Sequence, residues 1–229
     1  MSQSQVLDEL TAAPRYQAWL ASVASPYLGD EPIELGSGHG DYAALWLAQG
    51  LESITLTEVD AGRREVLQSR FRDDPRVVVA EVDLAAARPA THSAMVSFNV
   101  LEHIEDDLAA LAAAHTLVRP GGHVVHLVPA FPALMSRFDR EIGHFRRYRR
   151  PALARAATDA GLEVVECYYL NAPGLLAWWV VMRLLRRRPG DGSALRLWDR
   201  LVVPLARAAE SRHRSPFGQS VVLVARVPA

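Results

Sequence analysis

Short runs of consecutive apolar residues alternate along the chain with stretches in which apolar residues recur every three or four positions. The runs are rich in β-branched residues and predict buried strands, whereas the periodic stretches predict amphipathic helices. Strands are predicted at residues 32–35, 53–57, 77–82, 94–99, 123–128, 162–170 and 219–227. Because strands and helices alternate, the pattern predicts an α/β fold with a mostly parallel sheet.

The periodic stretches fall mainly between the predicted strands. Helices are predicted at residues 6–27, 42–48, 61–71, 105–118, 151–160, 174–185 and 195–209, and Pro204 predicts an interruption of the last one. Arg119-Pro120-Gly121-Gly122 has the composition of a turn, and residues 131–150 show no regular period. We expect a single domain, with a helical cap at 1–30, an α/β core at 31–170, a helical insertion at 172–216 and a final strand at 217–229.

Composition narrows the class of protein. The chain has 229 residues, 50% of them hydrophobic, which suffices for one well-packed domain. A net charge of −1 favours no nucleic-acid partner, and the single Cys167 excludes an internal disulfide and a multi-cysteine metal site. The first ten residues do not resemble a signal peptide, and the apolar run at 172–182 is too short to cross a membrane. We therefore predict a cytoplasmic protein without a metal ion.

A glycine loop, Gly36-Ser37-Gly38-His39-Gly40, follows the first predicted strand. A strand, a glycine loop and a helix together form a general nucleotide-binding device, because glycine lets the backbone approach a ligand and the helix offers free N–H groups. Dinucleotide-binding enzymes use the same device. Two details favour a methyl donor instead: the third glycine is not at the dinucleotide spacing, and Glu34 lies on the strand just before the loop.

Polar residues follow the next three strands at the edge where ligands bind in open α/β sheets. Glu58 ends the second strand, where a carboxylate can accept hydrogen bonds from ribose hydroxyls, although Asp60 competes for this role. Asp83 ends the third strand, where it could accept from an adenine amino group beside the Leu84 N–H. The segment from Asn99 to His103 follows the fourth strand.

Taken together, residues 33–40, Glu58, Asp83-Leu84, 99–104 and 117–122 resemble class I S-adenosylmethionine-dependent methyltransferases in order and spacing. The resemblance covers residues 15–170. It implies a Rossmann-like sheet of seven strands with an antiparallel last strand, helices on both faces and a helical insertion before that strand. It also implies S-adenosylmethionine as cofactor and S-adenosylhomocysteine as product. The predicted cofactor-binding residues are Glu34, Gly36, Ser37, Gly38, Glu58, Val59, Asp83, Leu84, Asn99 and Val100.

A second segment, Asp139 followed by Gly143-His144-Phe145-Arg146-Arg147-Tyr148, resembles a bacterial subgroup of these enzymes that identifies no acceptor. His144 or His103 could act as a general base and Tyr148 could orient an acceptor oxygen. The predicted substrate-binding residues are Asp139, His144, Arg147, Tyr148, Asn171 and Trp178. The alternative is a structural network in which Asp139 pairs with Arg147 and His144 bonds the backbone.

The acceptor is predicted to be a small molecule methylated on oxygen or nitrogen, in small-molecule biosynthesis such as secondary metabolism. Arginine clusters at 146–150 and 183–188 permit an anionic acceptor, although both also suit solvated surfaces. The apolar helix with Trp178 and Trp179 is expected to form a lid or a subunit contact in a monomer or homodimer, and a membrane-surface contact is the less favoured reading. Two alternatives stay open: a nicotinamide-dependent oxidoreductase and a non-catalytic cofactor-binding partner subunit.

Overall fold

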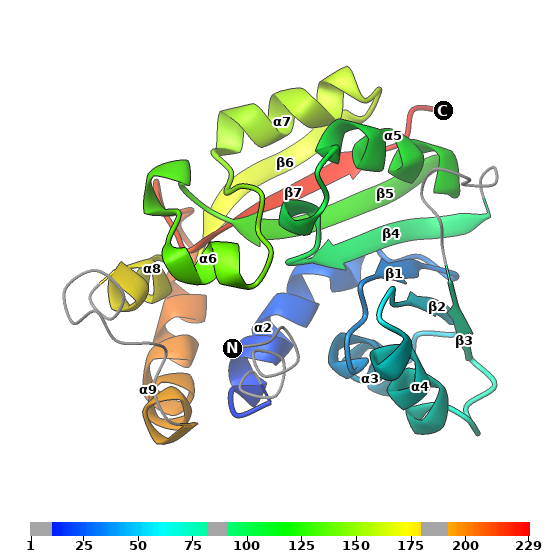
Figure 1. Cartoon of the computed structure of the whole chain (residues 1–229), viewed down its shortest axis with the longest axis horizontal. Coiled ribbons are helices and arrows are strands. Elements are labelled where there is room, and N and C mark those ends of the chain that lie inside the picture. Colours follow the sequence, from blue (N-terminus) through cyan, green and yellow to red (C-terminus); the bar gives the residue numbers. More distant parts are fainter. Residues whose placement is uncertain (1–10, 82–90, 180–191) are drawn as a thin grey trace.

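The computed structural model describes residues 11–81, 91–179 and 192–229, except for the side chains of residues 178, 192 and 193. One sheet runs through this part of the chain in the order β3-β2-β1-β4-β5-β7-β6 (Figure 1). Its strands are β1 (Ile33–Leu35), β2 (Ile54–Thr57), β3 (Val77–Ala80), β4 (His92–Phe98), β5 (Val118–Pro129), β6 (Glu163–Leu170) and β7 (Ser220–Arg226). Strands β1 to β5 pair in parallel, and β7 lies antiparallel to both β5 and β6. The predicted sheet with an antiparallel last strand is confirmed.

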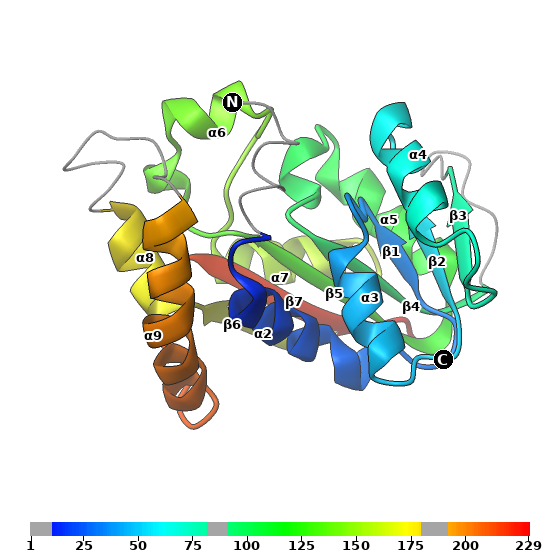
Figure 2. The ribbon, with the colours of Figure 1, turned by 90° about the horizontal axis from the view of Figure 1, so that it is seen from below.

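Helices cover both faces of the sheet (Figures 1 and 2). One face packs against α2 (Pro14–Ala24), α3 (Asp41–Ala48), α4 (Ala61–Arg70) and α9 (Gly192–Glu210). The other packs against α5 (Asp107–Leu117) and α7 (Arg150–Asp159). Neighbouring strand residues point to opposite faces, so Val96 belongs to the first core and Met95 to the second. Because both faces are buried, the central strands read as continuous apolar runs.

Several predicted boundaries are wrong. The first helix begins at Pro14, and residues 6–10 lie outside the described part. The turn at Arg119–Gly122 lies inside β5 as an irregularity in its pairing with β4, where His92 pairs with Val118 but Ala94 pairs with His123. The irregular segment contains two short helices, η4 (Pro132–Leu134) and α6 (Arg137–Glu141). Helix α6 forms because Ser136 and Asp139 make a reciprocal capping box at its N-terminus.

Helix α9 continues through Pro204, so the predicted interruption is also wrong. Two buried acids fix this helix to its neighbours. Asp199 accepts hydrogen bonds from the backbone N–H groups of Arg15 (3.2 Å) and Tyr16 (2.8 Å) at the start of α2. Glu210 accepts from the backbone N–H groups of Asn171 and Ala172 (both 2.9 Å) at the start of α8 (Ala172–Trp179). These bonds satisfy N–H groups that a helix cannot satisfy internally, and they fix the insertion to the core.

The outer face of α9 exposes a row of leucines, Leu197, Leu201 and Leu205, each more than half accessible to solvent. Among the described residues, no helix combines the length and the hydropathy needed to cross a membrane. The lid, subunit-contact and membrane-surface interpretations of the insertion stay predictions.

Candidate cofactor and acceptor site

The glycine loop connects β1 to α3 in a backbone conformation that favours glycine. Gly36 and Gly38 have φ angles of 65° and 56°, in the left-handed region that other residues adopt only with strain. A Cβ atom on Gly36 would also lie 2.5 Å from Cγ2 of Val100, which follows β4. The loop can therefore pass directly beneath the segment after β4 only if Gly36 has no side chain.

Ser37 fixes this loop to the end of β2. Its backbone N–H donates to the carbonyl of Thr57 (2.8 Å), and its hydroxyl oxygen accepts from the Thr57 N–H (3.2 Å). The Thr57 hydroxyl in turn donates to the carbonyl of Glu34 (2.9 Å). The Ser37 side chain is thus occupied within the protein, so its contribution to a cofactor site is to hold the loop in place.

Glu34 is the most unusual group at the loop. Its side chain is buried, and its Oε2 atom has no hydrogen-bond partner among the described residues. Burial raises the pKa of Glu34 to about 8 against a lowering contribution from Ser37, and the charges of Asp41 and Glu58 raise it further. A buried carboxyl group that is surrounded by acids suits a positively charged ligand. The side chains therefore fit S-adenosylmethionine, which carries a sulfonium and an ammonium group.

We expect the ligand-free Glu34→Gln variant to be more stable than the wild type at pH 8, by about 2–4 kcal/mol. The unfolded chain releases the Glu34 proton above a pH of about 4.5, whereas the folded chain keeps it until about pH 8. Stability from this group is therefore present below pH 4.5 and is lost as the pH rises to 8. Thermal unfolding from pH 5 to pH 9 measures the difference, with exposed Glu52→Gln as the control. Parallel pH profiles for wild type and Glu34→Gln would contradict the assignment.

Glu58 lies just after β2 and faces the glycine loop. Its carboxylate accepts hydrogen bonds from the backbone N–H groups of Gly38 (3.1 Å) and Asp60 (3.0 Å) and from Arg63 Nη2 (2.9 Å). Asp60, the competing acid, instead caps helix α4 by accepting from the Arg63 N–H (2.9 Å). The geometry thus favours Glu58 over Asp60 as the ribose-binding carboxylate, which stays a prediction.

The other predicted cofactor contacts lie at the same edge or outside the described residues. Val59 is 82% exposed beside Glu58, so its side chain is accessible to an adenine ring. Asn99 is exposed with a φ angle of 56°, and Val100 packs over Gly36. Asp83 and Leu84 lie in the range 82–90, outside the described residues. Their roles stay predictions.

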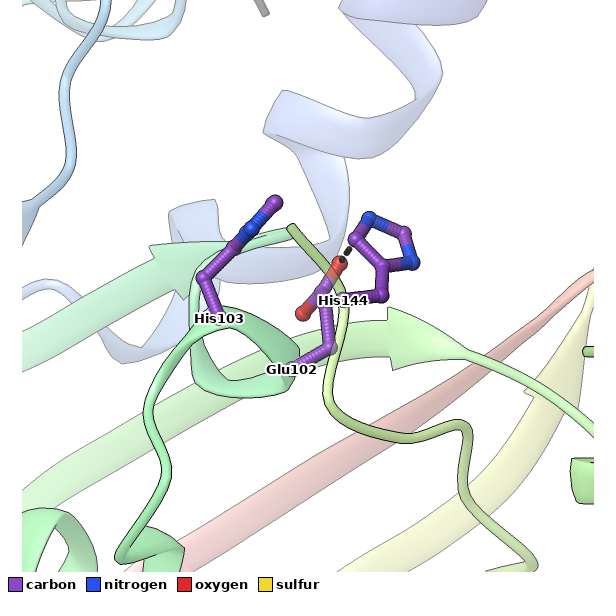
Figure 3. Close-up of side chains that lie close together, drawn as sticks. All are labelled: Glu102, His103 and His144. Carbon is purple, nitrogen blue, oxygen red and sulfur yellow. Dashed lines mark ion pairs between the residues drawn. The ribbon is translucent and has the colours of Figure 1, made fainter. Parts of the chain in front are cut away.

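The segment after α6 folds back onto η3 (Leu101–His103), the short helix that follows β4. The Phe145 N–H donates to the carbonyl of Glu102 (2.8 Å), and the Tyr148 hydroxyl donates to the carbonyl of Leu101 (3.4 Å). This docking brings His144 beside Glu102 and His103 (Figure 3). The rings of His103 and His144 lie edge to face with their centroids 4.6 Å apart.

Burial shifts the pKa values of Glu102 and His103 away from their ordinary values. Burial raises the pKa of Glu102 to about 8, partly offset by Arg147. Burial, His144 and Arg63 together lower the pKa of His103 to about 4. A histidine with so low a pKa is a weak general base at neutral pH. Because Arg63 also pairs with Glu58, its influence on His103 places the cluster close to the predicted ribose site.

Asp139 and Arg147 form the buried ion pair that the structural alternative predicts. Arg147 Nη2 donates to Asp139 Oδ1 at 2.6 Å, and Arg147 Nη1 donates to the carbonyl of Ala130 (3.2 Å). The second Asp139 oxygen accepts from the backbone N–H (2.6 Å) and hydroxyl (2.7 Å) of Ser136. His144 Nδ1 lies 3.3 Å from Asp139 Oδ1, so its side chain faces this carboxylate and not the backbone. Asp139 and Arg147 therefore hold His144 in place.

Two further predicted acceptor residues also bond within the protein. The Tyr148 hydroxyl donates to Asp107 Oδ2 (2.9 Å) on α5, and burial raises the pKa of Tyr148. Asn171 is fully buried: its Oδ1 accepts from the Gly174 N–H (3.0 Å), and its Nδ2 donates to Gln219 Oε1 (2.8 Å). These contacts favour positioning roles for both residues, and acceptor contact stays a prediction. The side chain of Trp178 lies outside the described residues.

An apolar groove with a volume of about 420 Å³ lies between the segment after β5 and α8. Its lining residues come from the segment after β5 and from α8: Phe131, Ala133, Leu134, Leu175, Leu176 and Trp179. The Phe131 N–H donates to the carbonyl of Tyr148 (2.8 Å), so the groove and the His144 segment share one scaffold.

The sequence did not single out Glu102 or Arg63 as functional residues. Glu102 was only part of a family-like segment, and Arg63 was one arginine among 25. The adjacent acid and histidine at the end of a strand were the only local signal for Glu102. Its burial and its proximity to His144 depend on how the segment after α6 docks.

Comparisons with known proteins agree with this geometry. Residues 13–167 match a family model described as a methyltransferase domain. A ubiquinone biosynthesis O-methyltransferase of Thiobacillus denitrificans is 30% identical over 159 residues, which cover 62% of this chain and 68% of the relative.

Solved structures give the same fold at low identity. A geranyl diphosphate C-methyltransferase from Streptomyces coelicolor superposes with a TM-score of 0.64 at 15% identity, over 90% of this chain and 76% of its own. A phosphoethanolamine N-methyltransferase of Haemonchus contortus superposes with a TM-score of 0.64 at 15% identity, over 92% of this chain and 52% of its own. Because these proteins methylate carbon and nitrogen, the fold alone does not identify the acceptor atom.

Proposed function

The chain belongs to the family of methyltransferase domains, and from this premise we propose that it methylates a hydroxyl oxygen of a small molecule that has an apolar part. That it is an S-adenosylmethionine-dependent methyltransferase follows from the family match, the curated relatives and the structural neighbours. These matches favour methyl transfer over the nicotinamide-dependent alternative. The acceptor, its reactive atom and a place in small-molecule biosynthesis are the proposed part.

The observation that carries the proposal is the apolar groove, whose residue Phe131 is hydrogen-bonded to the segment that carries His144. Five of the groove's six lining side chains are large and apolar, which suits a hydrocarbon chain or an aromatic ring. The curated relatives are ubiquinone biosynthesis O-methyltransferases, which supports oxygen as the acceptor atom. A hydroxyl oxygen also gains more than a neutral amine does from a group that accepts its proton, because the amine can attack through its lone pair.

An anionic acceptor receives less support from the arginine positions. Arg147 pairs with Asp139 (2.6 Å), and Arg146 pairs with Asp107 (2.5 Å), so both guanidinium groups already have acidic partners. The second predicted arginine cluster, at 183–188, lies outside the described residues. We therefore propose an acceptor whose recognition is mainly apolar.

The roles of the chain's own residues follow from their places. Glu34 and Glu58 would hold the positively charged and ribose portions of the cofactor, and the glycine loop would let them approach. When bound, S-adenosylmethionine supplies an activated methyl group that needs mainly a well-oriented nucleophile. The segment 131–148 would orient the acceptor and exclude water, because its side chains are tied to η3, α5 and β5.

Binding and turnover measurements test this function. Isothermal titration should show binding of S-adenosylmethionine without binding of NAD. Transfer of a radiolabelled methyl group should favour phenols and alcohols with apolar substituents over their short-chain analogues and over matched amines. Methylation of the amines alone would overturn the oxygen assignment, and equal rates for short and long acceptors would overturn the role of the groove. Cofactor binding without turnover across the panel would favour the non-catalytic alternative.

A further inference from the structure

Glu102, His103 and His144 converge from two segments that are distant in the sequence (Figure 3). Each offers one ligand atom, and these atoms all lie within 4.8 Å of one another. Glu102 and His103 come from η3, and His144 comes from the segment that docks onto it. The Nε2 atom of His144 lies 3.9 Å from Glu102 Oε1. One carboxylate and two imidazoles therefore face a common point.

The carboxyl group of Glu102 is buried without a hydrogen-bond partner for either oxygen among the described residues. The residue is 0% exposed. A buried polar group without a partner costs about 1–3 kcal/mol, and a buried charge costs more. A cation at the common point would supply the missing partner to a carboxylate that the fold already aims toward it.

The surroundings of both histidines match those of metal ligands. His103 Nδ1 lies 3.2 Å from the carbonyl of Gly143, and His144 Nδ1 lies 3.3 Å from Asp139 Oδ1. In protein metal sites the second ring nitrogen is held by a carbonyl or a carboxylate, which fixes the tautomer and orients the ring. His103 and His144 each have such an acceptor within 3.3 Å of Nδ1. Asp139 is itself held by Arg147 and Ser136. The Asp139 carboxylate is thus fixed by two neighbours.

We propose that Glu102, His103 and His144 bind one divalent transition-metal ion, with Zn²⁺ as the representative ion. Two imidazoles and one carboxylate are the ligands of catalytic zinc sites and of some iron sites, and both leave a coordination position open. Mg²⁺ prefers oxygen ligands only, so two histidines disfavour it. This proposal replaces the prediction from the sequence that the protein has no metal.

The open coordination position of the metal ion could bind the acceptor hydroxyl, a role that rests on the proposed function. A divalent metal ion lowers the pKa of a bound hydroxyl by several units, so that the oxygen loses its proton near neutral pH. The proton passes to solvent. The acceptor oxygen then forms a bond to the methyl carbon as the bond between that carbon and the donor sulfur breaks, and S-adenosylhomocysteine is released.

Metal binding by the tag-free full-length protein tests the site directly. After treatment with EDTA and dialysis, isothermal titration with Zn²⁺ should show one ion per chain. Addition of Co²⁺ should give visible absorption bands typical of imidazole and carboxylate ligands. Glu102→Gln, His103→Asn and His144→Asn should each weaken Zn²⁺ binding at least 10-fold and reduce the Co²⁺ bands. His115→Asn, on the exposed side of α5, is the matched control and should bind as wild type does.

The outcomes separate this inference from the proposed function. Absence of Zn²⁺ and Co²⁺ binding, or binding that the three variants leave unchanged, would overturn the metal site while S-adenosylmethionine binding and methyl transfer still support the function. Metal binding without methylation of any hydroxyl acceptor would overturn the proposed function and leave the site standing. Full activity in EDTA would overturn the role of the ion in activating the acceptor. Thermal unfolding of each variant confirms that a loss of binding is not a loss of fold.

Discussion

Replacing Asp139 by asparagine is expected to lower the free energy of unfolding by about 3–5 kcal/mol, because it leaves the buried guanidinium of Arg147 without its charged partner. The side chains of Asp139 and Arg147 are 2% and 5% exposed, and their closest atoms are 2.6 Å apart. Water cannot replace the lost carboxylate at such burial. For a chain of this length the change corresponds to a drop in melting temperature of roughly 10 °C, which differential scanning calorimetry would measure.

The neighbouring ion pair between Arg137 and Glu141 provides the control. It lies on the same helix, α6, but the Arg137 side chain is 92% exposed. Arg137→Ala should therefore change the free energy of unfolding by less than about 0.5 kcal/mol. A similar small effect of Asp139→Asn would show that the segment after α6 does not depend on this pair for its stability.

The pH dependence of Asp139 gives a second check. Burial alone would raise the pKa of this carboxyl group, but contacts with His144, Arg147 and Ser136 lower it below its usual value. Its contribution to stability is therefore present above the unfolded pKa, near 4, and is lost as the pH falls through the folded pKa. The difference in stability between wild type and Asp139→Asn should shrink as the solution is acidified.

The sheet and the donor side of the site were predictable because their signals are local. Apolar runs identified the strands, and the glycine loop after the first strand predicted a ligand-binding site. The structure shows why Gly36 is needed there, since a Cβ atom would clash with Val100. Glu34 and Glu58 were found from their places at strand ends, since parallel strands bring those ends to one edge. The sequence favoured Glu58 over Asp60, and the structure adds a reason, because Asp60 caps α4.

The acceptor side could not be predicted to the same depth because its signals are long-range. His144 lies beside Glu102 because the segment after α6 docks onto η3, through contacts such as the bond from the Phe145 N–H to the Glu102 carbonyl. No sequence period encodes these contacts. The sequence did predict the pairing of Asp139 with Arg147 in one of two interpretations, and the structure contains that ion pair. The other part of that interpretation, a bond from His144 to the backbone, differs from the structure, in which the His144 side chain faces Asp139. The shape of the groove depends on how α8 lies against Phe131 and Leu134. Glu210 on α9 holds the start of α8 by accepting a hydrogen bond from the Ala172 N–H.

The Pro204 error has a physical reason. Proline removes one backbone hydrogen bond and usually bends or ends a helix. In α9 the residues around it are held by packing, since Val203 and Ala206 are buried in the core shared with α2 and α3. Asp199 before the proline and Glu210 after it are both anchored to other helices. Tertiary contacts therefore outweigh the local preference.

Replacing Glu58 by glutamine is expected to weaken S-adenosylmethionine binding by about 10- to 100-fold. Hydrogen bonds to a charged group are worth about 1.5–3 kcal/mol, and each 1.4 kcal/mol is a factor of ten in affinity. The change keeps the shape of the side chain but removes the charge that Arg63 and the Gly38 N–H contact at 2.9 Å and 3.1 Å. Isothermal titration with S-adenosylmethionine measures the loss.

Glu52→Gln separates a specific effect of Glu58 from a general effect of removing an acid near β2. Glu52 precedes the strand, is exposed and lies at the opposite end from the glycine loop, so its variant should bind the cofactor as wild type does. A weakened Glu58→Gln variant that keeps its melting temperature would assign the carboxylate to the cofactor. If both variants bind as wild type does, the carboxylate serves only to hold Arg63 and the loop, and the ribose must be held by other groups at the same edge of the sheet.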